Sequence, residues 1–331
     1  MTETSPPHWG ADPSIAWRIL LTSVLTDAPG VDALTERQRA LHRAQGWPAP
    51  PAVTTGDLTT LRRDLAEVRD APLVLGLASD HLVVSAFHAY VDGLGLLEVL
   101  AALTDQEVGS SARGLGDRPS EVTGPAARLR EVALAPPAAV APPTGSASRP
   151  GDAYAEAEVP GRVRTADLVH AGVQAVLAHN RKAGRRSRHV TVAVGAGRPA
   201  PDGEPLRNRS ELLRLRDVEL LSRSEVAEAL RTAPVSAAGG SGVGGGRLSA
   251  VALRVLAPRL GSTLLVSHLG DVTTPAASTL TFHPVTAGGS GISLGAVGLD
   301  GRTVLTLRAR AAAWDEPGLS GLLARVVAGL S

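Results

Sequence analysis

A histidine and an aspartate lie four positions apart in the run Phe87–Gly93, and both side chains can take part in proton transfer. Neutral imidazole has a pKa near ambient pH, so His88 held within about 3 Å of a hydroxyl would act as a general base. The alternative is structural: a buried histidine bonded to a backbone carbonyl, and Asp92 capping the next helix. Both readings require a strand that ends at this run and a helix that begins there.

The flanking sequence supplies those two elements. His81–Phe87 is rich in branched and aromatic residues and predicts a buried strand, whereas Leu94–Leu103 has apolar residues at helical spacing. Gly93 allows a turn between them. Upstream, Pro72–Ala78 predicts a partner strand, joined to His81–Phe87 by a hairpin at Ser79-Asp80.

The rest of the chain mixes strand and helix patterns, which favours an α/β protein with mixed sheets. The predicted strands are Ile15–Leu25, Tyr154–Val159, Val190–Val194, Glu211–Leu215, Thr263–Ser267, Ser278–His283, Ile292–Val297 and Thr303–Arg310. The predicted helices are Val31–Gln45, Leu58–Val68, Ala126–Val132, Ala166–Arg181 with Thr165 as N-cap, Ser224–Arg231, Leu248–Leu256 and Gly318–Leu330.

Composition changes in the middle of the chain. Residues 105–150 are rich in Pro, Gly, Ser and Ala, which is typical of a linker. We therefore expect an N-terminal lobe at 1–104 carrying the motif, a linker at 105–150, and a C-terminal lobe at 151–331.

Four landmarks, in order, carry a resemblance to a known family. The His88-to-Gly93 pattern resembles the His-x-x-x-Asp-Gly signature of acyltransferases with the chloramphenicol acetyltransferase-like fold: condensation domains, wax ester synthases, polyketide-associated acyltransferases and plant alcohol acyltransferases. Thr191–Pro199 resembles the family's strand that ends in Arg-Pro, Leu206–Ser210 its Gly-Asn segment, and Leu264–Gly270 its Ser-Asn-Leu-Gly strand.

The resemblance implies two lobes with mixed sheets and a tunnel between them, with His88 as the base. It implies that Asp92 pairs with an arginine, for which Arg198 is the candidate, and fixes the motif loop. A backbone N–H near Gly93, or Ser267, His268 or Asn208, would contact the substrate or stabilise its oxyanion. The chain departs from the family pattern in three places: Phe87 replaces the first of two histidines, Arg207 the glycine before the asparagine, and His268 the usual asparagine.

The implied activity is transfer of an acyl group from an acyl-CoA or an acyl-phosphopantetheine carrier protein to a hydroxyl or amine of a small metabolite, in specialised (secondary) metabolism. That thioester would be a co-substrate, with no permanently bound cofactor. The alternative is a catalytically retired relative that keeps the fold to bind a thioester ligand or a partner protein. An intact His88, Asp92 and Gly93 favours the enzyme.

Composition excludes several other classes. Thirty-three basic and 32 acidic side chains nearly cancel, and the chain has only four Trp, two Tyr and two Phe, so we expect no nucleic-acid partner. It contains no cysteine and no apolar stretch near the roughly 20 residues of a membrane span. We expect a cytoplasmic monomer. We also expect no metal site, because no third ligand lies near His88 and Asp92 at helical spacing.

Three other patterns are weaker evidence of function. Gly240–Gly245 fits a dinucleotide-binding motif but follows no clear strand, and Gly291–Gly295 fits a serine-hydrolase elbow but continues into a strand. The first is interpreted as a flexible loop and the second as part of a strand. The basic run Arg181–Arg188 is interpreted first as a solvated turn, with Arg185 and Arg186 as candidate contacts to coenzyme A phosphates or to an acidic carrier protein.

Overall fold

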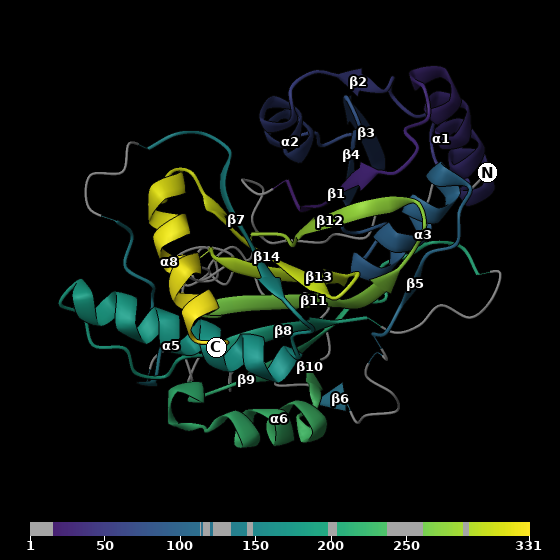
Figure 1. The fold of residues 1–331 in the computed structure, drawn as a ribbon. Helices are drawn as coiled ribbons and strands as arrows, with labels where there is room; N and C mark the ends of the chain where they lie inside the picture. The colour runs from purple at the N-terminus through teal and green to yellow at the C-terminus, as the bar shows by residue number, and fades with distance from the viewer. Residues whose placement is uncertain are drawn as a thin grey trace, which may run out of the picture.

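The structure is a computed structural model, and it describes residues 16–112, 114, 120–121, 134–143, 148–197, 204–236, 261–286 and 291–331. Two mixed sheets with helices against them form the molecule (Figure 1). The predicted α/β class with two mixed sheets is confirmed. The predicted helices Ala126–Val132 and Leu248–Leu256 and the glycine run Gly240–Gly245 lie outside the described residues.

The N-terminal sheet has five strands in the order β12-β1-β4-β3-β2. Its elements are β1 (Arg18–Leu25), α1 (Val31–Gln45), β2 (Thr54–Thr55), α2 (Leu58–Ala66), β3 (Leu73–Ala78), β4 (His81–Phe87), α3 (Gly93–Thr104) and β12 (Ala277–His283). Both faces of β1 are covered, because Leu20 packs with the α2 side and its neighbours Ile19 and Leu21 pack with the α3 side. Burial on both faces explains why the apolar residues of β1, such as Ile19–Leu21, are consecutive and do not alternate with polar ones.

The larger sheet runs β6-β10-β9-β8-β11-β13-β14-β7, with β5 on β11. Its strands are β5 (Gly109–Ser110), β6 (Ser120–Glu121), β7 (Asp152–Pro160), β8 (Val192–Ala196), β9 (Glu211–Leu215), β10 (Val235–Ser236), β11 (Leu264–Thr273), β13 (Ser293–Leu299) and β14 (Arg302–Arg310). The remaining elements are α5 (Thr165–Lys182), η1 (Val218–Leu220), α6 (Arg223–Thr232) and α8 (Glu316–Ala328), and Figure 1 shows α5 and α8 beside each other against this sheet.

Strand β12 joins the two halves of the chain. It lies within the predicted C-terminal lobe, yet it pairs antiparallel with β1, with Leu20 opposite His283 and Val24 opposite Thr279. The apolar core beneath it also draws on both halves, because Leu265, Leu269 and Phe282 pack in one cluster with α1, α3 and β4. A boundary at residue 151 therefore does not separate the two sheets.

Two local predictions need correction. Thr165 is not the N-cap of α5: Arg164 holds that position without a side-chain bond, and Thr165 is the first helical residue. Strand β11 runs six residues past the predicted end at Ser267, because Gly270 adopts φ +77° where the register with β13 shifts. No helix among the described residues is long and apolar enough to cross a bilayer.

Candidate active site

His88 follows the last residue of β4 and is fixed by backbone groups on both sides. Its N–H donates to the Trp17 carbonyl at 2.8 Å, and its Nδ1 lies 3.0 Å from the Val91 carbonyl oxygen. A carbonyl oxygen only accepts, so Nδ1 carries the proton in the neutral ring and Nε2 carries the lone pair. That is the tautomer a general base needs.

Burial lowers the pKa of His88 below its ordinary value of 6.5, and the Val91 carbonyl and the charge of Asp92 partly oppose this effect. The imidazole is therefore neutral, and able to accept a proton, at neutral pH.

Asp92 is only 3% exposed, and backbone donors bind both of its carboxylate oxygens. Oδ1 accepts the Gly95 N–H at 2.9 Å and so caps α3, and Oδ2 accepts the Arg209 N–H at 2.9 Å. Asp92 thus ties the motif loop to the segment before β9. The predicted partner Arg198 lies outside the described residues, so that pairing stays a prediction; a Cβ on Gly197 would lie 3.9 Å from Oδ2.

Gly93 has a different effect from the one we expected. Its backbone is not in the left-handed region, so the turn itself does not demand glycine. A Cβ at this position would lie 2.7 Å from Leu269 Cδ2 on β11. Glycine therefore allows the first residue of α3 to approach the larger sheet closely.

A cavity of about 530 Å³ lies where the two sheets meet, and both halves of the chain line it. The lining comes from Trp17, Ile19, His88, Asp92–Leu94, Ser111, Ala112, Gly114, Val163–Thr165, Val194–Gly197, Ser210–Leu213, Leu230, Leu265, Ser267–Asp271, Phe282, Pro284 and Val285. The structure thus brings His88, Asp92, Gly93, Ser267 and His268 to one cavity, although they come from segments far apart in the sequence.

His268 extends from β11 towards the start of α5. Its Nδ1 lies 3.2 Å from the Thr165 hydroxyl, and its buried Nε2 has no hydrogen-bond partner among the described residues. Burial lowers the pKa of His268 to about 4, against the opposing charge of Asp271. His268 is therefore a neutral polar group at the cavity and takes no proton near pH 7.

Solved structures resemble this chain over nearly its whole length. The first condensation domain of the calcium-dependent antibiotic synthetase, in complex with a substrate analogue, matches with a TM-score of 0.55 and 16% identity, covering 96% of this chain and 92% of that one. A mutant starter condensation domain of rhizomide synthetase, in complex with C8-CoA and Leu-SNAC, matches at 0.54 and 13%, covering 95% and 88%. The epimerization domain from the third module of tyrocidine synthetase B matches at 0.53 and 14%, covering 95% and 90%. By sequence, no family model and no curated protein matches.

The chain has the condensation-domain fold. The resemblance seen in the sequence motifs is thus confirmed for the fold. At these identities the likeness establishes architecture, and the chemistry must be argued from the residues of this chain.

Three predicted residues fall outside the cavity of this condensation-domain fold. Asn208 does not line it; its Oδ1 instead accepts the Ser210 N–H at 2.8 Å and shapes the turn before β9. Arg185 and Arg186 are exposed between α5 and β8 and are likewise absent from the lining. The residue after Asn208 makes the contact to the motif loop: the backbone N–H of Arg209 donates to Asp92.

Sequence reasoning missed most of the cavity lining, including Trp17 and Thr165. Trp17 lines the wall with φ +53°, a conformation that no local pattern predicted, and Thr165 was assigned to a helix cap although it contacts His268. Among the described residues no group of three or more His, Asp or Glu side chains could hold a metal ion.

We expect His268→Asn, which introduces the residue usual in the family that the sequence motifs resemble, to reduce the loss of stability at acid pH. Between about pH 6.5 and pH 4 this histidine is protonated in the unfolded chain but not in the folded one. The free energy of unfolding of the wild type therefore decreases as the pH is lowered, by up to roughly 3 kcal/mol. Urea unfolding at several pH values measures the difference between the two proteins. Parallel curves down to pH 4 would show that burial does not hold His268 neutral.

Proposed function

We propose that the protein is an acyltransferase that moves an acyl group from a coenzyme A or carrier-protein thioester to a hydroxyl or amine of a small metabolite. The observation that carries this proposal is the placement of His88: it lines the cavity between the sheets, and the Val91 carbonyl holds it in the tautomer with a basic Nε2. The condensation-domain fold supports it, because the mutant starter condensation domain of rhizomide synthetase, which has this fold, is in complex with C8-CoA and Leu-SNAC.

The proposed transfer needs no reactant besides the thioester and the acceptor. The acceptor O–H or N–H gives its proton to His88 Nε2 as the oxygen or nitrogen attacks the thioester carbonyl carbon. The tetrahedral intermediate collapses, the C–S bond breaks, and the imidazolium returns the proton to the thiolate, releasing free thiol. Ser267 and His268 on β11 line the cavity, and their side chains can donate a hydrogen bond to the oxyanion and would stabilise it.

The test is incubation with a panel of acyl-CoA and acyl-pantetheine thioesters and a set of alcohols and amines, with free thiol detected by a chromogenic reagent and products by mass spectrometry. Thiol release that requires the acceptor, with an ester or amide as product, is the expected result. Binding of thioesters without any turnover would instead identify the retired, ligand-binding relative.

The cavity also constrains the acyl group, because apolar side chains make much of its wall. Val163, Val194, Leu213 and Leu230 line it and belong to one apolar cluster. We propose that this cluster forms the end of the cavity in which the acyl chain lies.

Filling this end should therefore change chain-length preference. We expect Leu230→Trp to lower kcat/KM for octanoyl-CoA at least 10-fold relative to acetyl-CoA, since a single methylene in an apolar pocket is worth roughly 10- to 200-fold. Leu220→Trp is the matched control, because Leu220 is 78% exposed and does not line the cavity. An unchanged ratio of the two thioesters in Leu230→Trp would place the acyl chain elsewhere.

A further inference from the structure

The wall behind His88 is held from outside the cavity by one buried arginine. Trp17, Ile19 and Pro284 line the wall, and the residue between the first two is Arg18. Arg308 on β14 donates from Nη1 to the Arg18 carbonyl at 2.7 Å and to the Pro284 carbonyl at 3.1 Å. A single guanidinium thus binds the ends of β1 and β12, the two strands that make this wall.

Arg308 is itself rigidly placed. Its Nε and Nη2 each lie 2.7 Å from Asp152 Oδ2, and the side chains of the pair are 3% and 1% exposed. Arg310 Nη1 donates to the other oxygen of Asp152 at 3.2 Å, and the Tyr154 ring lies 5.6 Å from the Arg308 guanidinium carbon. Such a hydrogen-bonded, desolvated ion pair fixes geometry more strongly than an exposed one.

Trp17 connects this wall to His88 by a backbone hydrogen bond. The Trp17 carbonyl accepts the His88 N–H at 2.8 Å, and Trp17 holds φ +53°. A left-handed conformation in a bulky residue costs on the order of 1 to 3 kcal/mol and persists only where its surroundings enforce it. Arg308 binds the carbonyl of the following residue, Arg18, and Arg18 in turn donates from Nε to Ser85 Oγ on β4 at 2.8 Å.

We propose that Arg308, clamped by Asp152, is a positioning residue for His88: it enforces the strained backbone at Trp17, which sets the place of the histidine at the cavity. The inference depends on the proposed function only for its kinetic consequences, because the position of His88 can be measured without any substrate.

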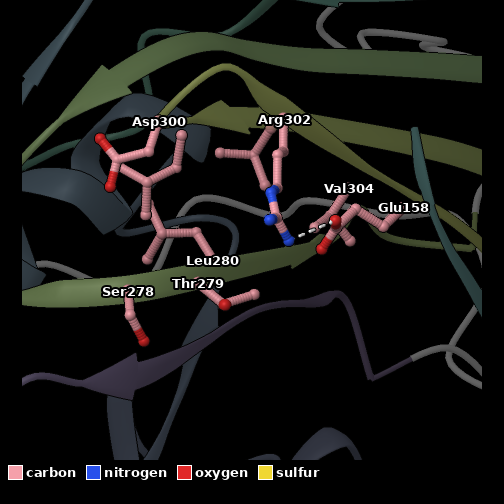
Figure 2. Close-up of a pocket in the computed structure, with 9 residues that line it drawn as sticks. Glu158, Ser278, Thr279, Leu280, Asp300, Arg302 and Val304 are labelled. Atoms are coloured by element: carbon pink, nitrogen blue, oxygen red, sulfur yellow. Dashed lines mark hydrogen bonds and ion pairs between the residues drawn. The ribbon is translucent and has the colours of Figure 1, made fainter. Parts of the chain in front are cut away.

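The test compares Arg308→Met with Arg302→Met. Arg302 is on the same strand and pairs with Glu158 at 2.9 Å, but those side chains are 69% and 47% exposed and line a second cavity (Figure 2), which His88 does not line. Since removing one member of a buried pair can unfold a protein, the double variant Asp152→Leu/Arg308→Met removes the clamp without leaving a buried charge.

The first measurement is the NMR titration of His88 in the absence of substrate, with His88→Ala used to assign its signal. Loss of the clamp admits water beside the imidazole, so we expect the His88 midpoint to rise towards about 6.5 in both Arg308 variants and to stay at the wild-type value in Arg302→Met. The other titratable or charged groups lining the cavity, Asp92, His268, Arg164, Glu211 and Asp271, are intact in every variant.

The second measurement is kinetic, with the best thioester of the panel. A displaced base should lower kcat by about 10- to 100-fold with little change in KM, and Arg308→Lys should recover part of the rate. A folded Arg308→Met or double variant with wild-type His88 midpoint and wild-type kcat would overturn the inference. If the wild type transfers no acyl group, the proposed function fails, and the titration alone still decides the role of Arg308.

Discussion

Replacing His88 with alanine is expected to lower acyl transfer by about 10²- to 10⁴-fold, the usual range for loss of a general base. The fold should survive, because His88 lines a cavity and its structural bond to Trp17 uses the backbone N–H, which alanine keeps. Acceptor-dependent thiol release and circular dichroism together measure both outcomes. The lowered pKa of His88 also predicts that the acid limb of the wild-type rate lies below pH 6.5, because activity is lost as the base is protonated.

His81→Ala is the matched control for this prediction. His81 begins the same strand β4 and bonds through Nδ1 to Asp80 at 2.8 Å, at the opposite end from the cavity. It should retain wild-type rates. A folded His88→Ala protein that turns over as fast as the His81 variant would remove His88 from the mechanism.

Asp92→Asn is expected to lower the free energy of unfolding by about 2 to 3 kcal/mol and to reduce activity with it. One amide oxygen can accept only part of what the carboxylate accepts from the Gly95 and Arg209 N–H groups, and the amide nitrogen repels the remaining donor. The buried donor is then left without a partner, and the motif loop loses its tie to the segment before β9. Urea unfolding measures the stability change.

Asp57→Asn separates this tie from ordinary helix capping. Asp57 caps α2 by accepting the Thr60 N–H at 2.9 Å, so it shares the capping role of Asp92 but makes no bond to a distant segment within the described part of the chain. We expect its loss to be about 1 kcal/mol or less, because asparagine is a good N-cap. Equal losses in the two variants would show that the Arg209 contact contributes nothing to stability.

Local patterns predicted most elements well, since the signal for each lies within its own residues. The helix Val31–Gln45 and the strands His81–Phe87 and Glu211–Leu215 have the predicted bounds, and the hairpin at Ser79-Asp80 is present. Periodicity and turn residues suffice there, because the pattern of apolar residues shows whether a segment is buried on one face or on both.

The contacts that build the site were beyond local reasoning. The Arg209 N–H that binds Asp92, the Thr165 hydroxyl beside His268 and the Leu269 side chain against Gly93 all come from segments remote in sequence. Each motif residue was found because its type and spacing suggested chemistry, but its partner has no signature of its own. Trp17 is the extreme case, because its carbonyl accepts the His88 N–H and the carbonyl of the next residue, Arg18, accepts from Arg308.

The pairing of β12 with β1 has a consequence for how the molecule is made. Val24 and Thr279 meet across this ladder, so the N-terminal sheet lacks its edge strand until more than 250 further residues have been synthesised. Closing so long a loop is slow, and a β1 edge rich in Leu remains open to wrong partners in the meantime. We therefore expect residues 1–150 expressed alone to aggregate, and co-expression with 151–331 to recover soluble, associated fragments.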